Sequence, residues 1–204
     1  MGRMLLRWVG VGLLLLLLMA CDNGQIFHKL RPNSVILAFG DSLTYGTGAG
    51  EGFGYPEQLK RLIARNVYNA GLAGETSAEG ARRLPGVLDE IKPDLVILCH
   101  GGNDMLRKLG KQQLKDNLRR MFEAVNQRGI PMVMIAVPRP GLLVSDADVY
   151  GDMAKELNIP LVEDVLGELL KDRQMKSDQV HLNDLGYGKL AEKVADKLIE
   201  LGVI

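Results

Sequence analysis

The stretch SVILAFGDSLT, residues 34–44, joins an apolar run directly to a polar turn. Residues 35–39 are typical of a buried parallel strand, and the strand ends at Gly40. Asp41 and Ser42 follow at once, so this strand would deliver a serine hydroxyl to the carboxyl end of a sheet, where open α/β folds build their sites. A serine after a glycine is equally well explained as a turn residue or a helix cap. A function for Ser42 therefore depends on what the rest of the chain places beside it.

Strands alternate with helices along the rest of the chain. Apolar runs typical of strands recur at 67–70, 95–99, 131–137 and 159–162. We expect helices over 56–64, through Ala81 to Leu88, and over 111–127, 147–157, 163–171 and 183–201. This alternation implies a parallel sheet with right-handed crossovers. We therefore predict an α/β fold, a three-layer α/β/α sandwich around a five-stranded parallel sheet, with the strand that contains Pro160 at its edge.

Composition excludes several classes of function. The 204 residues suit one domain, and 25 basic residues balance 25 acidic ones, so no basic surface for nucleic acid is expected. The glycine-rich loop 40–54 lacks the Gly-Lys-Ser/Thr ending of a phosphate-binding loop. Three histidines and two cysteines show no metal-ligand spacing. We expect no cofactor, no metal and no nucleic-acid partner, and we expect a monomer.

The first twenty residues have the pattern of an export signal rather than of a folded segment. Arg3 and Arg7 precede an apolar run over 9–19, which is too short to span a membrane comfortably. Ala20 and Cys21 follow, and this ending resembles the bacterial lipobox, which implies cleavage before Cys21 and acyl chains on that residue. A plain secreted protein or an uncleaved anchor remains an alternative.

The predicted domain boundaries follow from this leader. We expect a signal peptide over 1–20, a lipidated tether over 21–33 and one domain over 34–204. The protein would then face the periplasm from the cell envelope, and Asp22 resembles an inner-membrane retention signal. Several acyl chains would hold it firmly to a bilayer. Such a tether suggests the hypothesis that its substrates lie at the membrane surface.

Polar residues at the strand ends suggest a common chemistry. In a parallel sheet all carboxyl ends share one edge, and these ends carry Ser42, Gly71 and Asn103. The loop before the last helix carries Asp178 and His181, three residues apart. A serine nucleophile needs a base within reach and an acid to orient that base. Acyl transfer also needs donors for the oxyanion, which the N–H groups of Ser42 and Gly71 and the Asn103 amide would supply.

Four segments, in order, resemble the GDSL/SGNH hydrolase family. Residues 40–44 match its nucleophile block, 69–76 are similar to its glycine block, 101–104 match its asparagine block, and 178–183 match its Asp-x-x-His block. The likeness spans residues 34–201 and is nearest to periplasmic bacterial esterases of the thioesterase I/lysophospholipase type. The family's flavodoxin-like fold agrees with the sheet predicted above.

The resemblance implies nucleophile Ser42, base His181, orienting acid Asp178, and oxyanion donors Ser42, Gly71 and Asn103. Leu182 stands where many members have proline, and His100 is the one rival base, which we interpret as structural. The implied substrates are short or medium acyl esters, lysophospholipids and acyl thioesters. The alternatives are a carbohydrate O-acetylesterase of the same family and a non-catalytic lipoprotein that binds lipid or glycan.

Overall fold

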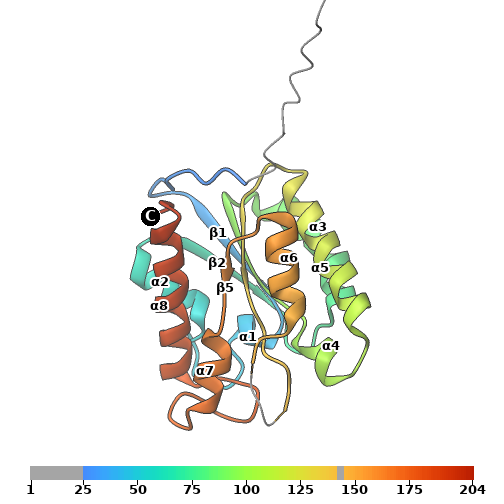
Figure 1. The fold of residues 1–204 in the computed structure, drawn as a ribbon. Helices are drawn as coiled ribbons and strands as arrows, with labels where there is room; N and C mark the ends of the chain where they lie inside the picture. The colour runs from blue at the N-terminus through green and yellow to red at the C-terminus, as the bar shows by residue number, and fades with distance from the viewer. Residues whose placement is uncertain (1–24, 142–144) are drawn as a thin grey trace, which may run out of the picture.

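The computed structural model describes residues 25–141 and 145–204 and shows five parallel strands in the order β2-β1-β3-β4-β5 (Figure 1). The predicted leader and its lipidation site lie outside the described residues. The strands are β1 (Val35–Gly40), β2 (Asn66–Gly71), β3 (Leu95–Cys99), β4 (Met132–Ile135) and β5 (Leu161–Val162). The α/β prediction is confirmed, and β5 lies at the sheet edge as expected from Pro160.

Helices cover both faces of the sheet (Figure 1). On one side α2 (Tyr55–Ile63) packs on α8 (Asp184–Glu200), and α7 (Val165–Lys171) contacts α8 as well. On the other side α5 (Lys111–Asn126) packs between α3 (Ser77–Ile91) and α6 (Asp148–Leu157). Two short helices, α1 (Ser42–Tyr45) and α4 (Gly102–Leu106), follow β1 and β3 directly. The sequence analysis did not anticipate these two, because each is only about one turn long.

The core lies between the central strands and the inward stripes of the helices. Every residue of β3 and β4 is buried, and β1 is buried after its first residue. Such strands are covered on both faces, which explains their continuous apolar runs. Leu84 of α3 and Leu190 of α8 close the two layers from opposite sides. This packing fixes the carboxyl ends of β1 and β3 next to each other, and the site is built on those ends.

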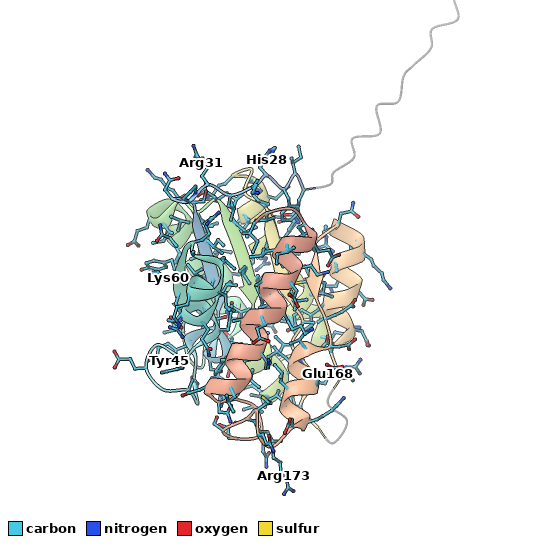
Figure 2. The ribbon with its side chains drawn as sticks, turned by 90° about the vertical axis from the view of Figure 1, so that its left-hand side faces the viewer. His28, Arg31, Tyr45, Lys60, Glu168 and Arg173 are labelled. Atoms are coloured by element: carbon cyan, nitrogen blue, oxygen red, sulfur yellow. The ribbon has the colours of Figure 1, made fainter. Side chains whose placement is uncertain are left out.

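The segment before β1 packs against the opposite, amino end of the sheet. The Gln25 side chain donates to the Met132 carbonyl at 3.2 Å and accepts from the Met132 N–H at 2.5 Å. Leu30 is buried in the core, and its N–H donates to the Val203 carbonyl at 2.7 Å. The described part of the predicted tether, residues 25–33, is therefore held against the domain. Figure 2 shows His28 and Arg31 at this end of the domain and Arg173 at the other.

Within the described residues, no helix has the length and apolar character needed to cross a bilayer.

Candidate active site

Ser42 is placed by the abrupt end of β1. Gly40 lies so close to the neighbouring strand that an added Cβ would come within 2.0 Å of the Cys99 carbonyl oxygen. The Asp41 carboxylate then accepts from the Leu43 N–H at the start of α1 and from the Gly102 N–H at the start of α4, both at 3.2 Å. The Asp41 carboxylate therefore links the start of α1, which carries Ser42, to the start of α4, which carries Asn103.

Ser42, His181 and Asp178 form a continuous hydrogen-bonded chain. Ser42 Oγ lies 3.0 Å from His181 Nε2, and His181 Nδ1 lies 2.7 Å from Asp178 Oδ2. An ionised carboxylate can only accept, so the hydrogen between the last two belongs to Nδ1. That tautomer leaves the Nε2 lone pair free to accept the Ser42 hydroxyl proton. The structure thus brings together the three residues that the sequence analysis singled out, although Ser42 and His181 are 139 positions apart in the chain.

The loop that carries Asp178 and His181 orients its own acid. Asp178 Oδ1 accepts from the N–H groups of Val180 and His181, each at 2.8 Å, which leaves Oδ2 for the ring. Partial burial would raise the pKa of Asp178, but the hydrogen bonds from the His181 ring and these two N–H groups outweigh it and lower the pKa below the usual aspartate value. Asp178 is therefore ionised at neutral pH and is suited to orient an imidazole.

The prediction that Gly71 supplies an oxyanion donor is wrong for this structure. Gly71 is the last residue of β2, its N–H donates to the Asn69 side chain at 2.9 Å, and it does not line the groove beside Ser42. An added Cβ would lie 2.1 Å from the Tyr45 nitrogen, so Gly71 allows α1 to pack closely on β2. Its role in the fold is one of close packing.

Gly74 occupies the position expected of the missing donor. It lines the groove with Ser42 and Asn103, and its φ of +81° lies in the left-handed region that favours glycine. Within the described part of the chain, neither its N–H nor that of Ser42 donates to another protein group. Gly71 and Gly74 belong to the same glycine block. They differ in that Gly71 ends β2, whereas Gly74 lies in the loop after β2 that lines the groove. The end of β2 at Gly71 is the signal that could have pointed to Gly74.

Asn103 enters the groove from the first turn of α4. Its Nδ2 donates one hydrogen to the Glu75 carbonyl at 3.0 Å. An amide nitrogen carries two hydrogens, so the second remains for a group bound in the groove. Because Glu75 directly follows Gly74, this bond also fixes the distance between the two candidate donors.

A second histidine–carboxylate pair lies beneath that loop. His100 is fully buried, and its Nε2 lies 3.1 Å from Glu75 Oε2, while Nδ1 has no partner in the described structure. Arg83 binds Glu75 with two bonds of 2.7 and 2.6 Å and lies 4.2 Å from the centre of the Phe39 ring. Burial would raise the pKa of Glu75, but the hydrogen bonds from Arg83 and His100 lower it overall. We call Glu75, Arg83 and His100 the buried ion cluster.

Asp104 and Ser77 fasten the same loop to the next helices. The Asp104 carboxylate accepts from the Ser77 N–H at 2.7 Å and from its hydroxyl at 2.5 Å. Asn117 of α5 donates to that hydroxyl at 2.9 Å. All three side chains are buried, so this network joins the starts of α3 and α4 without contact with a substrate.

The groove beside Ser42 has a volume of about 860 Å³ and opens to solvent. Leu106, Val137 and Pro138 supply apolar lining. Lys171 and Lys176 line the same groove. An apolar wall with a few polar groups near the reactive atom is typical of a small-molecule site.

Among the residues that the structure describes, no group of three or more His, Cys, Asp or Glu side chains is arranged to hold a metal ion. Cys99, the last residue of β3, is a buried free cysteine.

A nucleophile, a base and an oriented acid at the carboxyl edge of a parallel sheet define the class of α/β serine hydrolases. Residues 38–189 match the model of the GDSL-like Lipase/Acylhydrolase family, and the chain belongs to that family. It is accordingly a serine hydrolase that acts on esters.

Relatives of the chain agree with this assignment. The chain is 30% identical to esterase TesA of Pseudomonas aeruginosa over 190 residues, which are 88% of this chain and 94% of that protein. It is 30% identical over 171 residues to the thioesterase 1/protease 1/lysophospholipase L1 of Escherichia coli K12, covering 80% of this chain and 82% of the other. The crystal structure of TesA matches with a TM-score of 0.74 at 30% identity, covering 82% of this chain and 99% of that one. AlinE4, an SGNH-hydrolase family esterase, matches with a TM-score of 0.65 at 31% identity, over 84% of this chain and 98% of that one.

Proposed function

We propose that this chain is a lipid-anchored, monomeric serine esterase that uses Ser42, His181 and Asp178 to hydrolyse acyl esters and thioesters of short or medium chain length, including lysophospholipids. One observation carries the catalytic assignment. The Ser42 hydroxyl lies 3.0 Å from an imidazole nitrogen whose partner nitrogen is held 2.7 Å from a carboxylate, at the rim of an open groove.

The geometry supports a two-step acyl transfer. Ser42 Oγ attacks the acyl carbonyl as its proton passes to His181 Nε2, and the carbonyl oxygen gains negative charge. The N–H groups of Ser42 and Gly74 and the Asn103 amide would receive that charge. When the tetrahedral intermediate collapses, His181 returns the proton to the leaving oxygen or sulfur, and an acyl-enzyme remains. Water then attacks the acyl group, with His181 again taking and returning a proton.

The shape and charge of the groove support the proposed substrate class. Leu106, Val137 and Pro138 would pack on an acyl chain, and the open form of the groove sets no narrow limit on its size. Lys171 and Lys176 would favour a leaving group that carries negative charge or phosphate. Relatives named as an esterase and as a thioesterase and lysophospholipase support the same class.

The envelope location rests on the leader. Arg3, Arg7, the apolar run and Cys21 support lipidation of a mature chain that begins at Cys21. Asp22 supports retention at the inner membrane, with the domain facing the periplasm. Incorporation of labelled palmitate into the wild type but not into Cys21→Ser tests this part of the proposal, and palmitate on both proteins would contradict it.

A panel of esters and thioesters tests the catalytic part. The panel varies acyl length and leaving group and includes lysophosphatidylcholine and acetylated sugars. We expect hydrolysis by the wild type, and we expect Ser42→Ala to lose at least about 1,000-fold in kcat. Ser145→Ala is the matched control, because Ser145 is exposed and lies outside the groove, and it should retain full activity.

The outcomes separate the alternatives. Strong selectivity for acetylated sugars over all other esters would identify a carbohydrate O-acetylesterase. Binding of lipid or glycan without any turnover, unchanged in Ser42→Ala, would identify a non-catalytic lipoprotein.

A further inference from the structure

The chain enters the domain at the end of the sheet opposite the groove. Residues 25–34 lie across the amino ends of the strands, where Gln25 binds Met132 and Leu30 binds Val203. β1 then crosses the sheet once and delivers Ser42 at its carboxyl end. Six residues of strand span about 20 Å, and the 17 residues of α8 span about 26 Å. The entry point and the groove are thus separated by about the length of β1, and Figure 1 shows the chain entering at one end of the sheet and α1 towards the other.

The chain between the predicted lipidation site and the docked segment is short. Only residues 22–24 separate Cys21 from Gln25, and these four peptide steps reach at most about 14 Å. That reach is smaller than the height of the domain. As long as Gln25 stays bound at the amino end of β4, the groove cannot be turned down onto the membrane that holds the anchor.

The surface at the entry point combines an exposed apolar side chain with cations. Ile26 is 70% exposed, and it is followed by exposed Lys29 and Arg31. Residues 25–34 contain no acidic residue, and in the described structure neither cation joins an ion pair. An exposed apolar side chain beside unpaired cations is attracted to an anionic bilayer surface. We call residues 25–34 the entry surface.

We propose that the entry surface rests on the anionic bilayer that holds the Cys21 anchor and that the catalytic groove consequently faces away from this membrane. This inference rests on the proposed function and replaces the hypothesis of substrates in the anchoring membrane. The favoured substrates are acyl esters and thioesters that arrive from the aqueous side, or monoacyl lipids presented by other surfaces.

Two labelled variants measure the orientation directly. Cys99 is buried and Cys21 would carry lipid, so a thiol-reactive dye reports only an added cysteine. His28→Cys places the dye at the entry surface and Arg173→Cys places it at the opposite end (Figure 2). The full-length lipidated protein is reconstituted in vesicles of phosphatidylcholine and phosphatidylglycerol that contain an acceptor on the headgroups. We expect energy transfer at least about twofold stronger from position 28 than from position 173, because transfer falls with distance across a height of about 26 Å. Equal transfer, or stronger transfer from position 173, would overturn the proposal.

A lengthened tether tests the consequence for substrate access. Thirty Gly and Ser residues inserted between Gly24 and Gln25 have a typical reach of about 30 Å, which lets the domain turn over. We expect this variant to hydrolyse monoacyl phospholipid in its own vesicle at least about fivefold faster than the native tether does. Equal rates with both tethers would contradict the proposal. Both tether variants should hydrolyse a water-soluble p-nitrophenyl ester at the same rate. Absence of this hydrolysis in both variants would refute the proposed function. The two dye-labelled variants would still report the orientation in that case.

Discussion

The structure contains two histidine–carboxylate pairs, His181 with Asp178 and His100 with Glu75. They differ in whether the ring nitrogen that faces away from the carboxylate contacts another group. His181 is held by Asp178 through one nitrogen, and its other nitrogen meets the Ser42 hydroxyl at 3.0 Å. His100 is held by Glu75 at 3.1 Å, but it is fully buried and its other nitrogen has no partner in the described structure. The His181–Asp178 pair is thus arranged for proton transfer to and from Ser42, whereas the His100–Glu75 pair has a structural role.

The comparison also concerns charge and solvent. Asp178 is half exposed and is ionised through local hydrogen bonds, so its loop can form without a buried counterion. Glu75 is almost completely buried and depends on Arg83 for its charge. Removing one partner of a buried pair leaves an uncompensated charge, whereas an exposed carboxylate is solvated by water. The exposed pair should therefore control rate, and the buried pair should control stability and the position of the oxyanion donors.

The largest effect is expected at the base. His181→Ala removes the group that takes the Ser42 proton, and kcat should fall by at least about 1,000-fold. His181 is partly exposed, so the thermal unfolding midpoint should change little. Steady-state kinetics and circular dichroism measure both quantities. Retention of more than a tenth of the wild-type rate would remove His181 from the mechanism.

Asn103→Ala should give the second-largest fall in kcat. It removes the amide that would bind the oxyanion and the bond that holds the Glu75 carbonyl. We expect kcat to fall about 100-fold with a much smaller change in KM, because the interaction strengthens as the transition state forms. A change in KM alone would show that Asn103 binds the substrate and does not stabilise the oxyanion.

Glu75→Gln should affect both rate and stability, and we regard Glu75 as a positioning residue. The variant leaves Arg83 without its carboxylate, which should cost about 3 kcal/mol of unfolding free energy and about tenfold in kcat at unchanged KM. Denaturant unfolding and kinetics measure these quantities. A loss of stability with no change in kcat would confine Glu75 to a structural role.

The stability difference between wild type and Glu75→Gln should also depend on pH. The pKa of Glu75 is lowered in the folded state, so its stabilising contribution is complete above the unfolded pKa of about 4.5. The contribution is lost as pH falls through the lower folded value. The difference in unfolding free energy should therefore be constant from pH 6 to 8, an interval above both pKa values, and should shrink below about 4.5. A difference that grows on acidification would contradict this assignment.

His100→Asn should have the smallest effect. His100 supports Glu75 but touches neither Ser42 nor the groove, so kcat should fall by less than about fivefold and its pH profile should keep its shape. Lys60→Asn, a change at an exposed residue of α2, controls for the substitution and should leave activity unaltered. A shift of the acid limb of the profile in His100→Asn would show that His100 takes part in proton transfer.

The fold and most of the candidate site were predictable from the sequence because their signals are local. Apolar runs predicted the strands, and parallel topology then placed Ser42, Asn103 and the loop of Asp178 at one edge. Gly71 was misassigned because the glycine block offers two glycines, and strand pairing extends β2 through the first of them. Without the position of that strand end, nothing in the residue pattern distinguishes Gly71 from Gly74.

The buried ion cluster and the docked entry surface could not be predicted for a different reason. Glu75 and His100 are 25 residues apart, so no spacing marks them as a pair, and Arg83 joins them only through the packing of α3. The interpretation of His100 as structural agrees with its burial, but its acid partner was not found. Leu30 was assigned to a tether because a single leucine among polar residues gives no periodic signal of burial.

The central claim is that His181, and not His100, activates Ser42 for attack. Fluorophosphonate labelling followed by peptide mass spectrometry tests it without assuming any substrate. We predict rapid modification of Ser42 in the wild type, a rate at least about 1,000-fold lower in His181→Ala, and a rate within about fivefold of wild type in His100→Asn. Modification of a different serine, or a Ser42 rate that is unaffected by the loss of His181, would contradict it.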